Sequence, residues 1–110
     1  MTPREAYRKS YEAGKQLPEL EDIILTSPWF SCLYALDVIK GRWIEAEDII
    51  MTDTHESFDY AIDVIEGKLP EKMHNMMILH AIKEPSNSYV KAYFTALESL
   101  EFPNFIWTRD

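Results

Sequence analysis

The side chains best suited to metal binding or nucleophilic chemistry are few in this sequence. It contains three histidines and one cysteine, and it lacks the HExxH, GxSxG, P-loop and GxGxxG patterns. His55 and Asp59 are four residues apart, which would place two metal ligands on one helix face, although an exposed helix pair is the simpler interpretation. Cys32 lies beside the inward face of a predicted helix, where cysteine is a common core residue. We therefore expect no metal, no cofactor and no reactive thiol.

Carboxylates form two clusters, at residues 19–22 and 45–48. A catalytic pair of carboxylates has to converge in a pocket and show shifted pKa values. These clusters instead recur at the same place in two similar segments. Each falls at a predicted helix start, where the helix dipole stabilises negative charge. We therefore predict that the chain is not an enzyme, and a small hydrolase using Glu45, Glu47 and Asp48 is the less favoured alternative.

Asp37 and Asp63 are two further acids, each in mid-helix between apolar residues and at equivalent positions of the similar segments. They form either a solvent-facing stripe, which is the simpler interpretation, or an acidic ridge. Such a ridge would present one carboxylate per repeat to a basic partner.

One basic and aromatic spot, Lys40-Gly41-Arg42-Trp43, stands out in the chain. Arg42 and Trp43 could contact nucleic acid through charge and ring stacking. We favour packing of Trp43 between repeats, because Leu69 occupies the same place in the next segment. The apolar tail at 104–110 is a further candidate contact. The candidate partner-binding residues are Asp37, Asp63, Arg42, Trp43, Phe105 and Trp107.

The elements that position these residues come from an internal repeat. Residues 20–45 (LEDIILTSPWFSCLYALDVIKGRWIE) and 46–71 (AEDIIMTDTHESFDYAIDVIEGKLPE) are identical at 13 of 26 positions without a gap. A tandem period of this length is typical of stacked-repeat architectures. We predict an all-α, α-solenoid-like stack of helix-turn-helix repeats with a period of about 26 residues. Residues 1–110 form one domain, with an N-terminal cap at 1–18, repeats at 20–45 and 46–71, and a divergent third repeat and C-terminal cap at 72–104.

Local signals define the expected helices. Thr2 followed by Pro3 and Glu5 predicts a capping box at the first helix start. Gly14 is expected to end that helix, and Gly41 and Gly67 are expected to end the longer repeat helices, because glycine enters the left-handed conformation without a Cβ penalty. The predicted helices span 3–13, 19–25, 28–40, 54–66, 71–83 and a last one, capped by Ser86 or Asn87, that ends near residue 100. Tyr34, Tyr60, Ala35 and Ala61 are expected in the core.

Composition limits the class of partner. The 110 residues carry a net charge of −8, so free phosphate backbones are poor partners. Hydrophobic residues make up 46%, enough for a core. A single cysteine excludes an intrachain disulfide and favours the cytoplasm. No apolar run is long enough to predict a membrane span, and the N-terminus lacks an apolar signal region.

The first repeat also resembles a known pattern. Ser27-Pro28, the run from Tyr34 to Trp43 and Glu45-Ala46-Glu47 are similar to a short tandem repeat of many tailed-bacteriophage proteins and some bacterial ones. Ile44 replaces a proline of that pattern, and the second repeat keeps Pro70-Glu71 but lacks the Ser-Pro start. The resemblance implies a phage origin and a helical repeat, carries over no enzymatic activity and names no partner.

These observations favour a small acidic phage-encoded module that binds a host or phage protein and modulates or inhibits it by occupation. A nucleic-acid mimic that inhibits a DNA-binding protein is the alternative, ranked lower because Lys40, Arg42 and Lys68 interrupt the acidic rows. Self-association as a homodimer through the ends of the stack is a further alternative. Direct nucleic-acid binding and membrane association are disfavoured.

Overall fold

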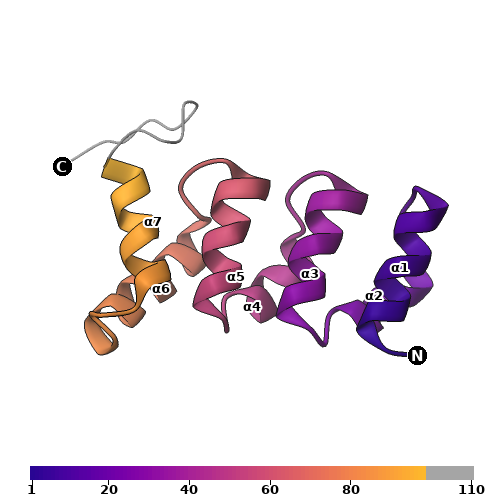
Figure 1. Ribbon diagram of the computed structural model, residues 1–110, viewed down its shortest axis with the longest axis horizontal. Coiled ribbons are helices and arrows are strands. Elements are labelled where there is room, and N and C mark those ends of the chain that lie inside the picture. The colour runs from indigo at the N-terminus through magenta and orange to yellow at the C-terminus, as the bar shows by residue number, and fades with distance from the viewer. Residues whose placement is uncertain (99–110) are drawn as a thin grey trace.

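The computed structural model describes residues 1–98, and this part of the chain is helical without a strand. Residues 99–110, which include the candidate contacts Phe105 and Trp107, lie outside the described part. The α-helices are α1 (Pro3–Ala13), α2 (Pro18–Ile24), α3 (Pro28–Tyr34), α4 (Glu47–Ile50), α5 (Thr54–Asp59), α6 (Glu71–Lys83) and α7 (Ser88–Glu98) (Figure 1). Two π-helical segments, η1 (Ala35–Ile39) and η3 (Tyr60–Ile65), directly follow α3 and α5, and a short 3-10 turn, η2 (Ile44–Ala46), precedes α4.

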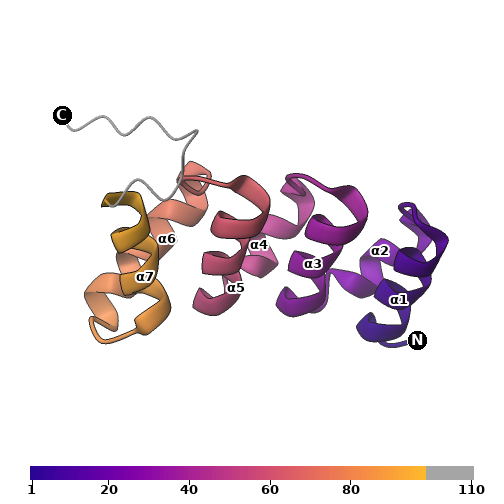
Figure 2. The ribbon, with the colours of Figure 1, turned by 45° about the horizontal axis from the view of Figure 1, so that its top comes forward.

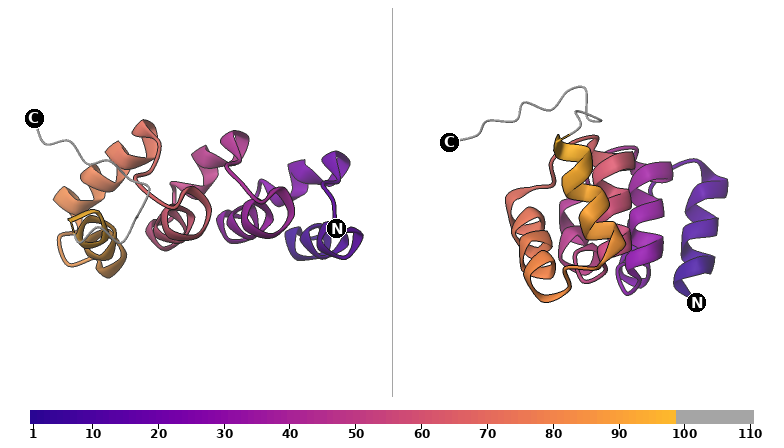
Figure 3. Two further views of the ribbon diagram at one scale, coloured as in Figure 1. Left: turned by 90° about the horizontal axis from the view of Figure 1, so that it is seen from above. Right: turned by 60° about the vertical axis from the view of Figure 1, so that its left-hand side comes forward.

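The helices are arranged in two layers. Helices α1, α3, α5 and α7 lie side by side in one layer, and α2, α4 and α6 lie in the other (Figure 3). Successive helix pairs follow one another from the N-terminal to the C-terminal end of the long axis (Figure 2). None of the helices in residues 1–98 has the length and apolar character that a membrane span requires.

The predicted helix starts are confirmed by their caps. Thr2, Ser27, Asp53 and Asn87 each accept a hydrogen bond, through a side-chain oxygen, from the backbone N–H three residues later, at 3.1–3.2 Å. The reciprocal bond of the predicted capping box is also present, because the Thr2 N–H donates to the Glu5 carboxylate at 3.2 Å. Short polar side chains satisfy N–H groups that a helix start otherwise leaves without a partner.

The predicted helix ends differ from the structure. The α-helices expected at 28–40 and 54–66 widen into the π-helical segments η1 and η3. Lys40 (φ 61°) and Glu66 (φ 58°), rather than Gly41 and Gly67, adopt the left-handed conformation, whereas Gly14 (φ 68°) does so as expected. The wider π-helical turn explains why the left-handed residue is Lys40 and not Gly41. The N–H groups of both Lys40 and Gly41 donate to the carbonyl oxygen of Ala35, so the helix ends one residue before the position expected from the sequence.

The core runs along the contact between the two layers. Tyr34, Tyr60 and Tyr93 are fully buried, as are Ala35 and Ala61. The two alanines sit where the π-helical segments begin or nearly begin, so a small side chain lies in both widened turns. Within residues 1–98, the buried apolar residues are Ala6, Ile24, Cys32, Tyr34, Ala35, Trp43, Ala46, Ile50, Tyr60, Ala61, Leu69, Met73, Met77, Val90, Tyr93, Ala96 and Leu97.

Candidate functional site

Each buried tyrosine hydroxyl binds residues at or near the start of the other, preceding helix of its own helix pair; the pairs are α2–α3, α4–α5 and α6–α7. The Tyr60 hydroxyl accepts a hydrogen bond from the Trp43 backbone N–H at 2.9 Å and donates one to Glu47 Oε2 at 2.9 Å. The Arg42 guanidinium donates two hydrogen bonds to the same carboxylate, from Nε to Oε2 at 2.7 Å and from Nη2 to Oε1 at 3.0 Å. These bonds raise the pKa of Arg42. The predicted contact residue Arg42 is exposed, but its guanidinium is already engaged within the fold.

The same arrangement occurs at the preceding pair. The Tyr34 hydroxyl accepts a bond from the Leu17 N–H at 3.2 Å and donates to Glu21 at 2.7 Å. Burial, assisted by Glu21, raises the pKa of Tyr34 to about 12. A phenol with so high a pKa stays protonated and keeps its donor at neutral pH.

At the third pair a histidine replaces the glutamate. The Tyr93 hydroxyl accepts from the Leu69 N–H at 3.0 Å and lies 2.7 Å from Nδ1 of His74. The Tyr93 hydroxyl can donate its proton to this nitrogen when His74 is neutral and Nδ1 carries no hydrogen. Burial and, to a lesser extent, Lys68 lower the pKa of His74, which favours that form.

Trp43 is not available to a partner. Its side chain is only 4% exposed, and its ring centroid lies 4.8 Å from that of Tyr34. The inclusion of Trp43 among the candidate partner contacts is therefore corrected, in favour of the interpretation preferred from the sequence, that Trp43 packs between the helix pairs. Its backbone N–H is also held by Tyr60.

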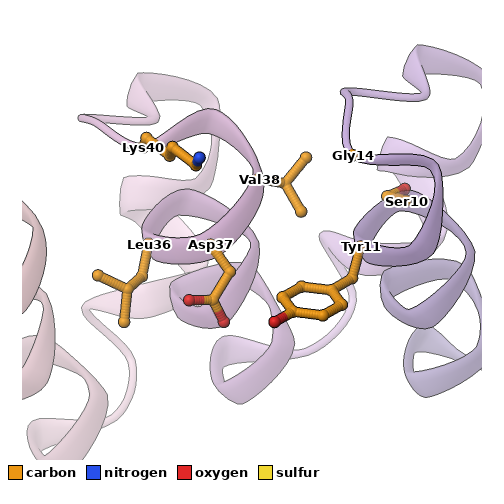
Figure 4. Close-up of a pocket in the computed structure, with 7 residues that line it drawn as sticks. All are labelled: Ser10, Tyr11, Gly14, Leu36, Asp37, Val38 and Lys40. Carbon is orange, nitrogen blue, oxygen red and sulfur yellow. The ribbon is translucent and has the colours of Figure 1, made fainter.

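Asp37 and Asp63 do not have equivalent surroundings. The half-buried Asp37 accepts a 2.6 Å hydrogen bond from the Tyr7 hydroxyl, whereas Asp63 is exposed. Asp37 points into an open cavity of about 480 Å³ between η1 and α1, which the Tyr11 ring enters from the other side (Figure 4). Lys40 lines both this cavity and a smaller one that contains Asp63. Lys40 is thus a shared lining residue of the cavities that contain the two acids of the expected ridge.

Two of the three acids considered for a hydrolase, Glu47 and Asp48, are paired with cations, and Glu45 does not line their cavity. Glu47 and Asp48 line a cavity of about 440 Å³ between α4 and the start of α6. Glu47 is bound by Arg42, and Asp48 forms a 2.7 Å ion pair with Lys72. Neither acid is left as an isolated charge in that cavity.

His55 and Asp59, considered from the sequence as two possible metal ligands or as a simple helix pair, lie close together on α5. Nε2 of His55 lies 3.1 Å from Asp59, and Nδ1 lies 3.4 Å from the buried Glu56. Asp53, His55 and Glu56 offer ligand atoms within 4.8 Å of one another. Burial raises the pKa of both Glu56 and Asp59. However, Asp53 already caps α5 and the His55 ring stacks on Tyr89 at 4.4 Å, so local packing accounts for the group.

Cys32 is a core residue. Its side chain is 4% exposed, and its thiol lies 3.9 Å from the carbonyl oxygen of Glu56. Burial, with a contribution from nearby acids, raises the pKa of the thiol to about 12. The reactive thiolate is therefore scarce at neutral pH.

Three exposed aromatic side chains of residues 1–98 were missed in the sequence: Tyr11, Trp29 and Tyr89. Together with the half-buried His55, they form a row on the layer of α1, α3, α5 and α7, here called the aromatic row. Their exposed fractions are 58% for Tyr11, 49% for Trp29 and 39% for Tyr89. Ring centroids are 6.2 Å apart between Trp29 and His55 and 4.4 Å between His55 and Tyr89. Trp29 and His55 occupy the same position of the 26-residue alignment, a signal that could have identified an outward face.

A cleft between α1 and α3 forms the N-terminal end of the aromatic row. Its volume is about 480 Å³. Tyr7 and Phe30 contact each other with centroids 5.8 Å apart, and the Arg4 guanidinium lies 6.0 Å from the centre of the Phe30 ring. The cleft is lined by Arg4, Tyr7, Arg8, Tyr11, Glu12, Trp29 and Phe30.

Comparison of this chain with protein-family models, with curated proteins and with solved structures finds no match. A function therefore has to be argued from the side chains of the fold itself.

Proposed function

We propose that this chain is a small protein-binding module, built as a short α-solenoid with a period of about 26 residues. It contacts its partner through the layer of α1, α3, α5 and α7. The aromatic row on this layer is the observation that carries the proposal, and hydrogen bonds that recur from one helix pair to the next support the repeat.

The hydrogen bonds that support the repeat have a regular spacing. Leu17, Trp43 and Leu69 stand 26 residues apart, and the backbone N–H of each donates to a buried tyrosine hydroxyl. Tyr34 and Tyr60 share this spacing, whereas Tyr93 comes later and makes its second contact with a histidine. A terminal unit that differs from the others is common in repeat proteins.

The aromatic row has the composition of a protein interface. Tyrosine and tryptophan are enriched at the centres of interfaces, where they provide most of the binding free energy. Here Tyr11, Trp29 and Tyr89 each keep more than a third of their surface in solvent. Because they lie on one layer that four helices build, a partner could cover them together.

The mode of action in this proposal is occupation of the partner, without a cofactor. The resemblance of the first repeat to tailed-phage proteins suggests that the partner is a host or phage protein in the host cytoplasm. Lys40 lines the cavities of both Asp37 and Asp63, which favours this function over nucleic-acid mimicry, because mimicry needs rows of acids without intervening cations.

Affinity capture tests the proposal. The wild-type chain and a variant with Tyr11→Ser, Trp29→Ser and Tyr89→Ser would be immobilised and exposed to lysates of phage-infected bacteria. We expect a protein that binds the wild type and is lost from the variant. A control with Ile44→Ser and Ile82→Ser, which are exposed side chains of η2 and α6, should retain it.

Two results would contradict the proposed function. One is that the aromatic-row variant and the control capture the same proteins equally well. The other is that the control loses the partner and the aromatic-row variant keeps it, which would assign binding to the opposite layer. Circular dichroism of each variant establishes that the fold is intact before binding is compared.

A further inference from the structure

The cleft between α1 and α3 combines exposed rings of the aromatic row with exposed cations. Arg4 and Arg8 follow each other by one helical turn on α1, so both guanidinium groups lie on the cleft side. Arg4 contacts the face of Phe30, and neither arginine forms an ion pair within residues 1–98. Both charges are thus open to a ligand.

The charge around the cleft is opposite to that of the rest of the protein. Residues 1–18 contain four Lys or Arg against two acids, whereas residues 19–110 contain seven against seventeen. Within the cleft lining, Arg4 and Arg8 face a single carboxylate, that of Glu12. A ligand with negative charge is therefore attracted to this end and repelled by the remainder of the surface.

The walls of the cleft define the second property of the ligand. Tyr7 and Phe30 are half-buried, and Trp29 and Tyr11 are the exposed rings. A volume of about 480 Å³ accommodates one or two side chains rather than a folded surface. An aromatic or aliphatic side chain in such a cleft would bury the ring of Trp29, which is the usual basis of an interface anchor.

Resting on the proposed function, we infer that the α1–α3 cleft binds a short acidic segment of the partner protein. The segment inserts an aromatic or aliphatic anchor side chain against Trp29 and Tyr11 and places carboxylates beside Arg4 and Arg8. A nucleic-acid strand would also offer negative charge, but its length would bring further phosphates against the acidic remainder of the chain. The acidic peptide is the ligand whose charge can be confined to this end.

Selection from a yeast-displayed library of random peptides tests the inference with a defined probe. The wild-type chain is the bait, and a variant with Arg4→Glu and Arg8→Glu is the counter-selection bait. We expect enriched peptides that combine aspartate or glutamate with tryptophan, phenylalanine or leucine. Enrichment of basic or uncharged peptides, or of no peptide, would overturn the inference.

The affinity of one enriched peptide then identifies the residues that bind it, by fluorescence anisotropy at physiological salt. Trp29→Ala is expected to weaken binding about 30-fold, the effect of an interface anchor worth about 2 kcal/mol. Arg4→Glu with Arg8→Glu is expected to weaken it about 10-fold or more, and the loss should shrink at high salt.

Two matched controls separate the cleft from general effects. Lys9→Glu with Lys15→Glu makes the same change in net charge on exposed residues that do not line the cleft. Ile82→Ala removes an exposed apolar side chain on α6. We expect both controls to bind the peptide within about 3-fold of wild type, since screening limits distant charges.

The failure of this inference can be told from that of the proposed function. If the Lys9/Lys15 substitutions lower the affinity for the peptide as much as the Arg4/Arg8 substitutions do, the cleft does not bind the carboxylates of the peptide specifically and the inference is refuted. If lysate capture still depends on Trp29 and Tyr89 in that case, the aromatic row remains the binding surface. If capture fails as well, both are refuted.

Discussion

Replacing Tyr60 by alanine is expected to unfold the protein or to lower its Tm by at least about 12 °C. The ring is fully buried, and removing a buried aromatic side chain costs about 3–5 kcal/mol. The lost hydroxyl leaves the Trp43 N–H without its acceptor, at a further cost of about 1–3 kcal/mol. Small domains are stable by only about 5–15 kcal/mol, and each kcal/mol shifts Tm by roughly 4–8 °C.

Tyr60→Phe separates the two contributions. It keeps the ring and removes the hydroxyl that bonds Trp43 and Glu47, so we expect a loss of about 1–3 kcal/mol. Tyr11→Ala is the matched control, because that ring is 58% exposed and its truncation should change stability by less than about 1 kcal/mol.

Thermal and urea unfolding, followed by circular dichroism at the helical band, measure these differences. Tyr34→Ala should behave as Tyr60→Ala does, since its ring is also fully buried. If Tyr60→Ala melts within a few degrees of Tyr11→Ala, the ring is not in the core and the reasoning is refuted. A Tyr60→Phe variant as stable as wild type would refute only the role of the hydroxyl.

Further predictions concern single residues. Because burial lowers the pKa of His74 in the folded state, its contribution to stability is present above the unfolded pKa of about 6.5 and is lost as pH falls below it. Urea titrations at pH 7 and pH 5 should therefore show a larger loss for wild type than for His74→Gln, and equal losses would contradict this. Lys40→Gly should raise the free energy of unfolding by about 1 kcal/mol by relieving a left-handed backbone, whereas Gly14→Ala should lower it by a similar amount. Changes of the same sign at these two sites in thermal melts would refute the assignment of strain.

The helix starts could be predicted from the sequence because capping is local. The side chains of Thr2, Ser27 and Asp53 each bond a backbone N–H only three residues away, so the residue types within one helical turn determine the capping hydrogen bond. The helix ends could not be predicted in the same way. The π-helical turns that begin at Ala35 and Tyr60 place the left-handed conformation on the residue before the glycine. The preference of glycine for that conformation does not reveal that an α-helix will widen into a π-helix.

The candidate site was predictable only in part for a similar reason. Trp43 stands beside two basic residues, but its burial depends on the ring of Tyr34 from another element. Asp37 and Asp63 share a repeat position, yet only Asp37 has a tyrosine from α1 within reach. By contrast, Trp29 directly follows the helix start at Pro28 and lies off the inward stripe, so helical spacing alone could have placed it on the surface.

The net charge of the chain differs between the N-terminal end of the proposed binding surface, which is basic, and the remainder, which is acidic. The acidic remainder of the chain keeps most anions away, while the basic helix α1 stands at one end of the aromatic row. Such an asymmetry orients an incoming partner before the rings are covered, and its effect falls as salt is raised. The association rate of a partner should therefore fall with ionic strength more than its dissociation rate changes.

Site-specific photo-crosslinking tests the central claim, that the layer of α1, α3, α5 and α7 is the binding surface, most directly. A photoreactive phenylalanine analogue would replace Trp29 in one variant and Ile44, on η2 beside the opposite layer, in another. Illumination in a lysate that contains the partner is predicted to give a covalent adduct from position 29 and none from position 44. Adducts from position 44 alone, or equal adducts from both positions, would contradict the account.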